Sequence, residues 1–330
     1  MNPGPAPDPG PAPAPAFDPA PGPAPTLTVA ICAYTLERWT LLRAAVDSVH
    51  RQQPPPGELL LVIDHNDELL SRASELEGVT VLANQQRPGL SGARNTALAA
   101  ARGTVTAFLD DDAAARPGWS ATLLAAYRDA GVLGAGGLVA PHWQHGRPRW
   151  FPPAFDWVVG CSHSGMPRRP ARVRNLIGAN MSFRTEAARA AGGFRTDLGR
   201  VGRRPLGCEE TELCLRLAAR HPGTRMHYDP AAAVRHHVPR QRATARYFAA
   251  RCLAEGRSKA MVARRTGPGP ALASERAYLR RTVPAALRRA LLHGRLGTAA
   301  ALTAGVLLTT GGYLAERAAQ LTHHPVRGTP

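Results

Sequence analysis

Residues 87–112, RPGLSGARNTALAAARGTVTAFLDDD, combine a loop, a short helix and a buried strand that ends in three consecutive aspartates. Ser91 is a candidate N-cap, and small and apolar residues follow it at helical spacing until Gly103 ends the helix. The strand is too apolar to have a wet face. Ligands of open α/β sheets bind at the carboxyl ends of such strands. The stretch therefore predicts a ligand site at the aspartates.

The aspartate triplet indicates a metal ion. In an extended chain Asp110 and Asp112 point the same way, because alternate side chains share a face. Crowded carboxylates repel one another unless a cation neutralises them, and Mg²⁺ or Mn²⁺ shared with phosphate oxygens is the usual solution. A solvated acidic turn is the alternative, but the buried strand leading into the triplet favours the metal.

The same stretch carries a family resemblance. Gly-Leu-Ser-Gly-Ala-Arg-Asn at residues 89–95, then a strand and the triplet, resembles the nucleotide-sugar site of family 2 glycosyltransferases, the inverting enzymes of the GT-A fold. The resemblance covers about residues 26–259. Its motifs occur in the expected order: Asp64, Arg94-Asn95, the triplet, Gly178-Ala179-Asn180, Glu209-Glu210 and His236. Each motif is short, so the ordered set carries the resemblance.

The segments before the triplet fit that fold. Residues 27–33 (LTVAICA), 58–64 (ELLLVID), 79–83 and 104–110 read as strands, with a helix over residues 39–53. This alternation predicts an α/β protein with a GT-A-type, doubly wound, mainly parallel sheet, helices on both faces and further helices at the C-terminus. The dinucleotide Gly-x-Gly-x-x-Gly fingerprint and the P-loop are absent from the sequence, which counts against dehydrogenases and P-loop kinases.

The resemblance also implies the donor side of the site. Asp64 matches the family acid that holds the nucleoside, although His65-Asn66-Asp67 departs from the usual continuation. The implied metal ligands are Asp110, Asp112 and His236, with His237 as an alternative to His236. The implied nucleotide-sugar contacts are Thr35, Glu37, Asp64, Arg94, Asn95, Asp110 and Asp111.

On the acceptor side, Gly178-Ala179-Asn180 has the form of the family segment that passes under the acceptor. Trp150 and Trp157 lie in a long irregular region, where they either stack on a sugar ring or plug the core beneath the loop.

Glu210 stands where the family carries the second acid of Glu-Asp, which is its general base. Glutamate lengthens the arm by one methylene but can still take a proton. The alternative is that Glu209 and Glu210 only complement a helix dipole, as acids in a first helical turn commonly do.

The charge of +17 is concentrated near the C-terminus. Residues 235–295 contain 15 Arg or Lys against Glu255 and Glu275, and Lys259 is the only lysine in the chain. Nucleic acid, an anionic membrane surface and phosphorylated substrates all suit such a patch. By resemblance, Arg242, Arg246 or Lys259 would contact the donor diphosphate.

Four regions are expected. Residues 1–25 form a Pro/Ala-rich tail that cannot fold, and residues 26–240 form the GT-A catalytic domain. Residues 241–295 form a basic helical extension, and residues 296–330 an uncharged helix and tail. The uncharged residues 296–315 just reach the length of a membrane span, so this helix packs on the domain, lies at the membrane interface or spans the membrane.

The compartment is expected to be the cytoplasm, at the inner face of the membrane where the C-terminal helix engages lipid. The five cysteines are scattered without paired spacing, which favours a reducing compartment, and no signal peptide is visible.

The sequence thus predicts an inverting, metal-dependent glycosyltransferase of polysaccharide, glycolipid or other cell-envelope glycoconjugate synthesis. The donor is a UDP-, GDP- or dTDP-sugar, and the acceptor is a glycan, a lipid-linked sugar or a small molecule. One alternative is a sugar-nucleotide pyrophosphorylase, but residues 32–35 do not supply the Gly-rich basic loop of those enzymes. The other is a basic nucleic-acid-binding protein, which leaves the aspartates and Glu210 unexplained, so no nucleic-acid partner is expected.

Overall fold

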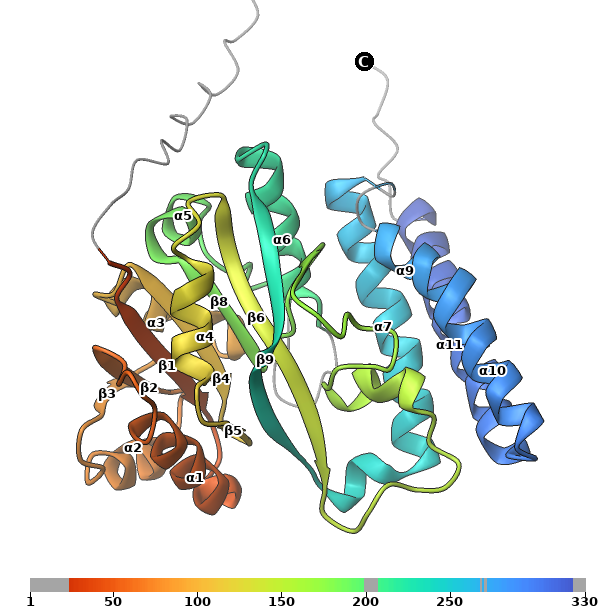
Figure 1. The fold of residues 1–330 in the computed structure, drawn as a ribbon, viewed down its shortest axis with the longest axis horizontal. Helices are drawn as coiled ribbons and strands as arrows, with labels where there is room; N and C mark the ends of the chain where they lie inside the picture. Colours follow the sequence, from red (N-terminus) through yellow and green to blue (C-terminus); the bar gives the residue numbers. More distant parts are fainter. Residues whose placement is uncertain (1–23, 199–206, 268, 270–271, 323–330) are drawn as a thin grey trace, which may run out of the picture.

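The structure is a computed structural model that describes residues 24–198, 207–267, 269 and 272–322 (Figure 1). Residues 1–23, which make up most of the expected tail, lie outside the described residues, as do residues 323–330. A sheet flanked by helices forms one side of the molecule, and a layer of C-terminal helices forms the other (Figure 1).

One nine-stranded sheet runs through the catalytic part in the order β3-β2-β1-β4-β8-β6-β9-β5, with β7 paired to β9. The strands β1 to β4 are parallel, and β8 joins β4 in the antiparallel direction. The bounds are β1 Leu27–Ala33, β2 Glu58–Ile63, β3 Thr80–Ala83, β4 Val105–Asp110, β5 Ala113–Ala115, β6 Val132–Trp143, β7 Ala171–Val173, β8 Asn180–Arg184 and β9 Arg225–Val238. The four predicted strands are confirmed to within a residue at each end.

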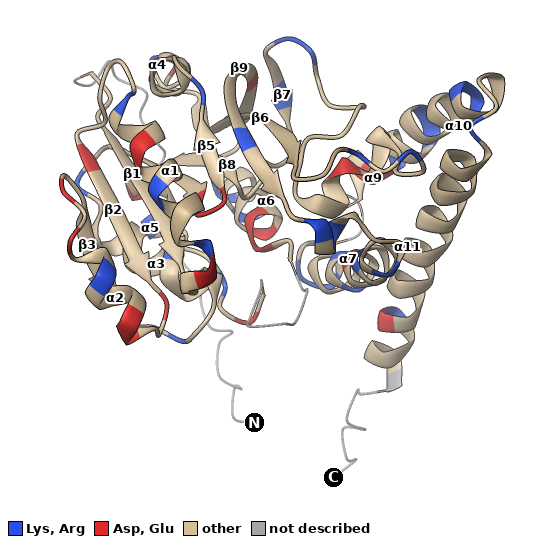
Figure 2. Ribbon diagram, turned by 90° about the horizontal axis from the view of Figure 1, so that it is seen from below, with Lys and Arg blue, Asp and Glu red and all other residues tan. Residues whose placement is uncertain are grey.

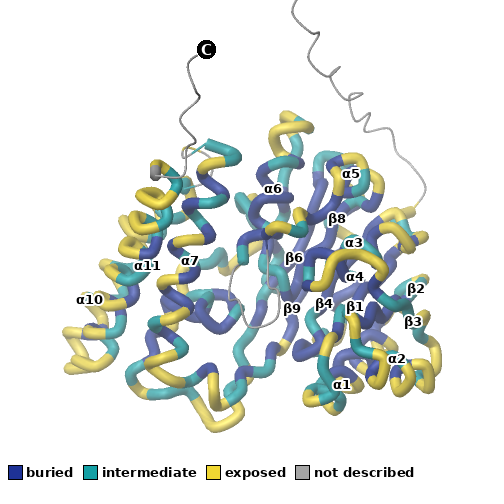
Figure 3. Tube along the Cα trace, turned by 180° about the vertical axis from the view of Figure 1, so that it is seen from behind, coloured by how far each residue is buried: buried dark blue, intermediate teal, exposed yellow. Residues whose placement is uncertain are grey.

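Helices cover both faces of this sheet. They are α1 Trp39–His50, α2 Asp67–Ala73, α3 Leu90–Ala100, α4 Trp119–Ala126, α5 Thr185–Ala190 and α6 Glu209–Arg220, with short 3₁₀ turns η1 Leu36–Arg38, η2 Pro153–Val159 and η3 Arg240–Ala243. The central strands bury side chains on both faces: in β1, Val29 and Ile31 belong to the core that contains α1, whereas Ala30 belongs to the core beneath α3 (Figure 3). This two-sided burial explains why the strands are continuously apolar.

The start of α3 differs from the prediction. The helix begins at Leu90 with Gly89 as its N-cap, and Gly89 has a φ of 123°, a conformation that glycine adopts readily. Ser91 lies inside the helix, where its buried hydroxyl donates to the Leu198 carbonyl oxygen at 2.9 Å. The predicted Ser91 cap is therefore wrong, because a glycine with positive φ, rather than a hydroxyl, makes the entry into the helix.

The C-terminal helices are α7 Ala245–Thr266, α9 Ala273–Ala277, the π-helical turn η4 Tyr278–Thr282, α10 Val283–Leu292 and α11 Leu296–Thr322. In the described part of the chain, α11 is the helix long and apolar enough to cross a membrane by length and composition. One of its faces packs on α7 through glycines. A Cβ on Gly256 would lie 2.0 Å from the Thr309 carbonyl oxygen, and one on Gly312 would lie 2.2 Å from the Leu253 carbonyl oxygen. The backbones of α7 and α11 are therefore in direct contact.

Because of this contact, Gly312→Ala should separate the two helices and lower the free energy of unfolding by about 1–3 kcal/mol, the usual cost of overpacking. Gly311→Ala is the matched control on the same helix, since a Cβ there meets nothing within 4 Å. The control should be neutral or stabilise by up to about 1 kcal/mol through helix propensity. Urea unfolding of the two variants measures the difference, and equal midpoints would contradict the backbone contact.

Candidate active site

A cavity of about 780 Å³ opens at the carboxyl ends of β1, β2 and β4. Its wall includes the aspartate triplet, the first turn of α6 and the loop before β8. On the opposite side it is closed by α7, α9, η4 and α11. The C-terminal helices therefore form part of the site and are not a separate appendage.

The triplet does not lie in extended chain as predicted. The strand β4 ends at Asp110, and Asp111 and Asp112 form the turn into β5. The turn still brings carboxylates together: Asp110, Asp112 and His236 each offer a ligand atom within 4.8 Å of the others. His236 reaches the group because it pairs with Ala113 in the sheet. His236 lines the cavity and His237 does not.

The charges around these aspartates are closely balanced. Arg38 Nη1 lies 2.8 Å from Asp111 Oδ1 and 3.3 Å from Asp112 Oδ2, and Arg242 Nη2 lies 3.6 Å from Asp112 Oδ2. Burial and the neighbouring Asp112 raise the pKa of Asp111 to about 7. Burial alone would lower the pKa of His236, but the Asp112 carboxylate, 3.1 Å away, raises it to about 10.

The residues present fit a divalent cation. Asp111 Oδ2 is buried and has no hydrogen-bond partner among the described residues. An orphaned carboxylate oxygen in the interior is costly unless a cation or ligand satisfies it. Carboxylate oxygens with one imidazole form a donor set suited to Mg²⁺ or Mn²⁺.

Asp64 follows β2 and lines the cavity. Its Oδ1 accepts from Asn84 Nδ2 at 2.6 Å, and its Oδ2 accepts from the Gly89 backbone N–H at 2.9 Å. Two elements therefore hold Asp64 at the edge of the cavity. The sequence analysis did not identify Asn84 as a site residue. Its position directly after β3, at the same edge of the sheet as Asp64, could have indicated it.

Thr35 and Glu37 are not brought to the cavity, contrary to the prediction. The Thr35 hydroxyl accepts the Glu37 backbone N–H at 3.3 Å and caps η1. Their neighbours Tyr34 and Arg38 line the cavity instead. The 3₁₀ turn therefore places Tyr34 and Arg38 in the cavity wall, whereas Thr35 and Glu37 lie outside it.

Arg94 lies at the centre of the site with an exposed fraction of 2%. Its Nη1 is 2.7 Å from Glu209 Oε1, and its Nη2 is 3.4 Å from Asp110 Oδ1. The same Nη2 donates to the Gly178 carbonyl oxygen at 3.1 Å. One buried guanidinium therefore ties α3 to β4, to α6 and to the predicted acceptor segment.

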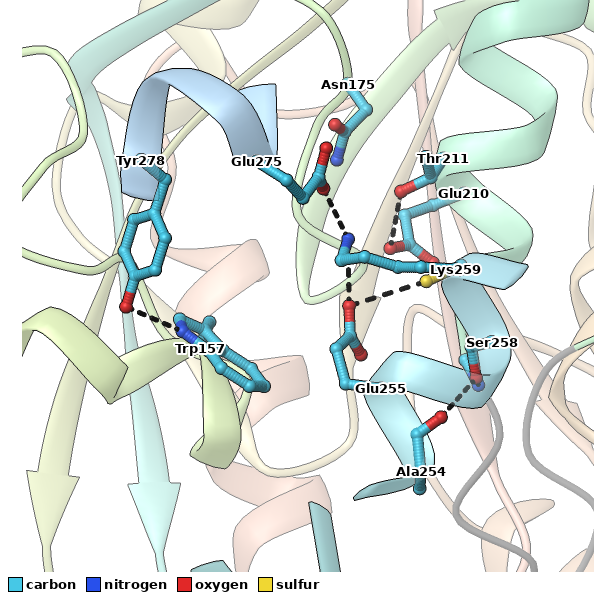
Figure 4. A network of polar contacts seen from close by, with 12 residues as sticks. Trp157, Asn175, Glu210, Thr211, Ala254, Glu255, Ser258, Lys259, Glu275 and Tyr278 are labelled. Atoms are coloured by element: carbon cyan, nitrogen blue, oxygen red, sulfur yellow. Dashed lines mark hydrogen bonds and ion pairs between the residues drawn. The ribbon is translucent and has the colours of Figure 1, made fainter. Parts of the chain in front are cut away.

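The two acids that open α6 lie in different surroundings. Both line the cavity, but Glu209 is buried against Arg94, whereas Glu210 is partly exposed. Glu210 accepts from the Thr211 hydroxyl at 3.3 Å (Figure 4). Burial and the neighbouring Glu209 raise the pKa of Glu210 to about 8. A carboxyl group with such a pKa exchanges a proton readily near neutral pH.

The predicted acceptor-side residues divide into two groups. Gly178, Ala179 and Trp157 line the cavity. Asn180 points into the core, where it accepts from Trp119 Nε1 at 2.8 Å and donates to the Ala232 carbonyl oxygen at 2.7 Å.

Two further predicted residues serve the packing of the domain and do not line the cavity. Asn95 bonds both backbone groups of Phe194, which is 99 residues away in the chain. Trp150 packs against Phe151 and Phe248 and lies off the cavity. The irregular aromatic region therefore both plugs the core, through Trp150, and lines the cavity, through Trp157.

Tyr278 and Lys259 also line the cavity. The Tyr278 hydroxyl accepts from Trp157 Nε1 at 3.3 Å (Figure 4). Lys259 was predicted only as a candidate for the donor diphosphate, and Tyr278 was not predicted. Both come from helices whose packing no sequence pattern revealed.

A GT-A-like sheet with carboxylates at the ends of its parallel strands fits the class of glycosyltransferases that use a nucleotide-sugar donor. A profile of the family described as "Glycosyl transferase family 2" matches residues 28–192, half of the chain. This protein belongs to that family, as the sequence predicted.

Two proteins are similar to this chain in sequence. The glucosyl-dolichyl phosphate glucuronosyltransferase of Haloferax volcanii is 32% identical over 238 residues, which are 71% of this chain and 76% of that protein. The pre-mycofactocin glycosyltransferase of Mycobacterium tuberculosis is 28% identical over 189 residues, which are 54% of this chain but only 37% of that protein.

A solved structure confirms the fold class. The mannosyltransferase of Pyrobaculum calidifontis, in complex with GDP-Man and Mn²⁺, superposes with a TM-score of 0.56 at 21% identity and covers 93% of this chain and 89% of that one.

Proposed function

We propose that this chain transfers a sugar, with inversion at the anomeric carbon, from a nucleotide-diphosphate sugar to a hydroxyl group of a lipid-linked acceptor. The observation that carries the proposal is a single cavity that joins the Asp110–Asp112–His236 group to Glu210. The name of the Haloferax relative, 32% identical, supports the lipid-linked acceptor class. The donor base and sugar belong to the UDP-, GDP- or dTDP-sugar class.

At the donor end, Asp110, Asp112 and His236 would hold Mg²⁺ or Mn²⁺, and the Mn²⁺ named with the Pyrobaculum structure supports this choice. When bound, the ion neutralises the charge that builds on the leaving diphosphate. Asp64 accepts hydrogen bonds from the nucleoside. Arg38 and Arg242, which now face Asp112, supply positive charge beside the diphosphate.

At the acceptor end, Glu210 removes the proton from the acceptor hydroxyl as it attacks. The hydroxyl oxygen forms a bond to the anomeric carbon while the bond to the diphosphate breaks, so no covalent sugar–enzyme intermediate is needed. Glu209 is held by Arg94 at 2.7 Å and is therefore committed to the fold. Both acids line the cavity, but Glu210 is the partly exposed acid of the pair.

Glu210→Gln keeps the size and helix position but cannot accept a proton, so turnover should fall by about 10²–10⁴ while donor affinity stays within a few-fold. In the parent protein, only the carboxylate form of Glu210 is active. Turnover should therefore rise with pH and level off above about pH 8, where that group is ionised. Steady-state rates over a pH series test both statements.

Glu209→Gln is the control for this experiment, because its main effect should be on stability through the loss of the Arg94 ion pair. If Glu209→Gln abolishes turnover in folded protein while Glu210→Gln remains active, the assignment is displaced by one residue. If both variants stay active, the acids serve only the helix dipole.

The metal site leads to a second test. Asp112→Asn should remove the Mn²⁺ dependence of UDP binding while the protein stays folded, because the residue lies in a turn at the mouth of the sheet. Calorimetric titration of UDP with and without Mn²⁺ measures the effect. Equal UDP affinity under both conditions in the parent protein would refute the metal site.

The outer face of the C-terminal helices supports a membrane partner. Exposed leucines, at 54–72% of their full area, lie on α10 and α11: Leu291, Leu292, Leu296, Leu307, Leu314 and Leu321. Arginines accompany them on or beside α10: Arg280, Arg288, Arg289 and Arg295. Figure 2 shows basic residues along α10. Since the other face of α11 packs on α7, we infer that the helix lies on an anionic membrane surface at the cytoplasmic side and does not span it.

The protein should therefore sediment with vesicles that contain phosphatidylglycerol and should be released by high salt, which screens surface charges. The double variant Leu307→Glu, Leu314→Glu should bind more weakly. Ala99→Glu with Ala100→Glu, both exposed on α3, adds the same charge elsewhere and should bind like the parent. Retention in high salt with release only by detergent would indicate a span, and absence of binding at low salt would refute a membrane partner.

A further inference from the structure

The cavity has opposite charge at its two ends. Near β4, the lining cations Arg38, Arg94 and Arg242 face five carboxylates, those of Asp64, Asp110, Asp111, Asp112 and Glu209. At the C-terminal end, five cations line the cavity, Arg172, Arg174, Arg251, Lys259 and Arg281, against Glu210, Glu255 and Glu275. The first end needs a metal before it can receive a phosphate, whereas the second offers positive charge from the chain itself.

A compact ion cluster stands at the centre of the C-terminal end. Lys259 Nζ lies 3.0 Å from Glu255 Oε1 and 2.5 Å from Glu275 Oε1 (Figure 4). Arg251 Nη2 lies 3.3 Å from Glu255 Oε2, and Arg174 Nη2 donates to Glu275 Oε1 at 3.0 Å. Three cations thus share two carboxylates in a mostly buried place, and an anion entering here would complete the charge balance.

Beyond this cluster the lining becomes apolar and reaches the surface. Tyr278 and Val306 line it, and they lie on η4 and α11 respectively. Leu279 and Thr310, on the same two elements, line the cavity and are also exposed. Exposed lining residues therefore lie on both η4 and α11, and Thr310 is three residues along α11 from the exposed Leu307.

The order of these features matches the order of groups in one class of ligand. A ligand bound along the cavity would contact the general base Glu210 first and the cations Lys259 and Arg174 next. Its far end would contact apolar lining residues that lead to the exposed leucines of α11. A sugar hydroxyl, a phosphate and a hydrocarbon chain require these surroundings in the same order.

We propose that the C-terminal end of the cavity binds the lipid-phosphate part of the acceptor, with the phosphate at Lys259 and Arg174 and the hydrocarbon chain leaving between η4 and α11. This inference rests on the proposed function and specifies its acceptor as a phosphate ester of a lipid alcohol. It also assigns Lys259 to the acceptor, whereas the sequence had suggested the donor diphosphate for this residue.

Calorimetry of the full chain with UDP and Mn²⁺ present tests the proposal without knowledge of the sugar. The probes are farnesyl phosphate, farnesol and inorganic phosphate. Farnesyl phosphate should bind at least about tenfold more tightly than either of the others, because it alone engages both the cations and the apolar exit. Lys259→Met should remove most of this preference over farnesol.

A second pair of variants tests the opening itself. Thr310→Trp places a large ring at the exit and should weaken farnesyl phosphate binding at least about tenfold. Thr303→Trp is the matched control, since Thr303 is exposed on α11 seven residues earlier and does not line the cavity. Because Thr310 is exposed, its variant should fold even if Lys259→Met does not.

The outcomes separate this inference from the function on which it depends. UDP binding with Mn²⁺ should be unchanged in all variants, and its absence from the parent protein would refute the proposed function. If the parent binds UDP but farnesyl phosphate binds no better than farnesol, the cations do not hold a phosphate. If Thr310→Trp and Thr303→Trp bind farnesyl phosphate equally, the chain does not leave between η4 and α11. Either result overturns the proposal.

Discussion

The buried guanidinium of Arg94 is the interaction on which the site depends. Its cost of desolvation is offset by Glu209 and Asp110, and it also bonds the carbonyl of Gly178. These partners come from β4, from α6 and from the loop before β8. The carboxylate at the end of β4, the first turn of α6 and the loop before β8 are therefore positioned relative to one charged group.

This arrangement also separates the roles of two adjacent acids. Glu209 forms an ion pair with Arg94, and burial together with the charge of Glu209 raises the pKa of Glu210. One acid is therefore tied to the fold, while its neighbour can exchange a proton near neutral pH. Ion pairs also form at the aspartates. Arg38 pairs with Asp111 and Arg242 with Asp112, so each arginine offsets negative charge that a bound cation would otherwise neutralise. The arginines therefore offset only part of the negative charge at this end of the cavity.

The sequence predicted those parts of the molecule that depend on local pattern. A continuously apolar strand followed by acids identifies both the sheet and the ligand end, because burial on two faces and the position of the strand end are local properties. Other predicted residues do not line the cavity, because a distant partner or their own turn holds their side chains elsewhere. Asn180 is turned inward by Trp119, and Thr35 is occupied by its own 3₁₀ turn. Lys259 and Tyr278 reach the cavity only through helix packing, which periodicity does not specify.

The glycine contact between α7 and α11 has a consequence for recombining this enzyme with its relatives. Gly256 meets the backbone of α11 and Gly312 meets the backbone of α7, so each helix is shaped to the other over the same stretch. A chimera that joins one parent's α7 to another's α11 would combine surfaces that were never fitted together. The suitable crossover point is the short segment between the end of β9 and Thr244. A chimera joined there exchanges all the C-terminal helices together, including the side of the cavity that they form.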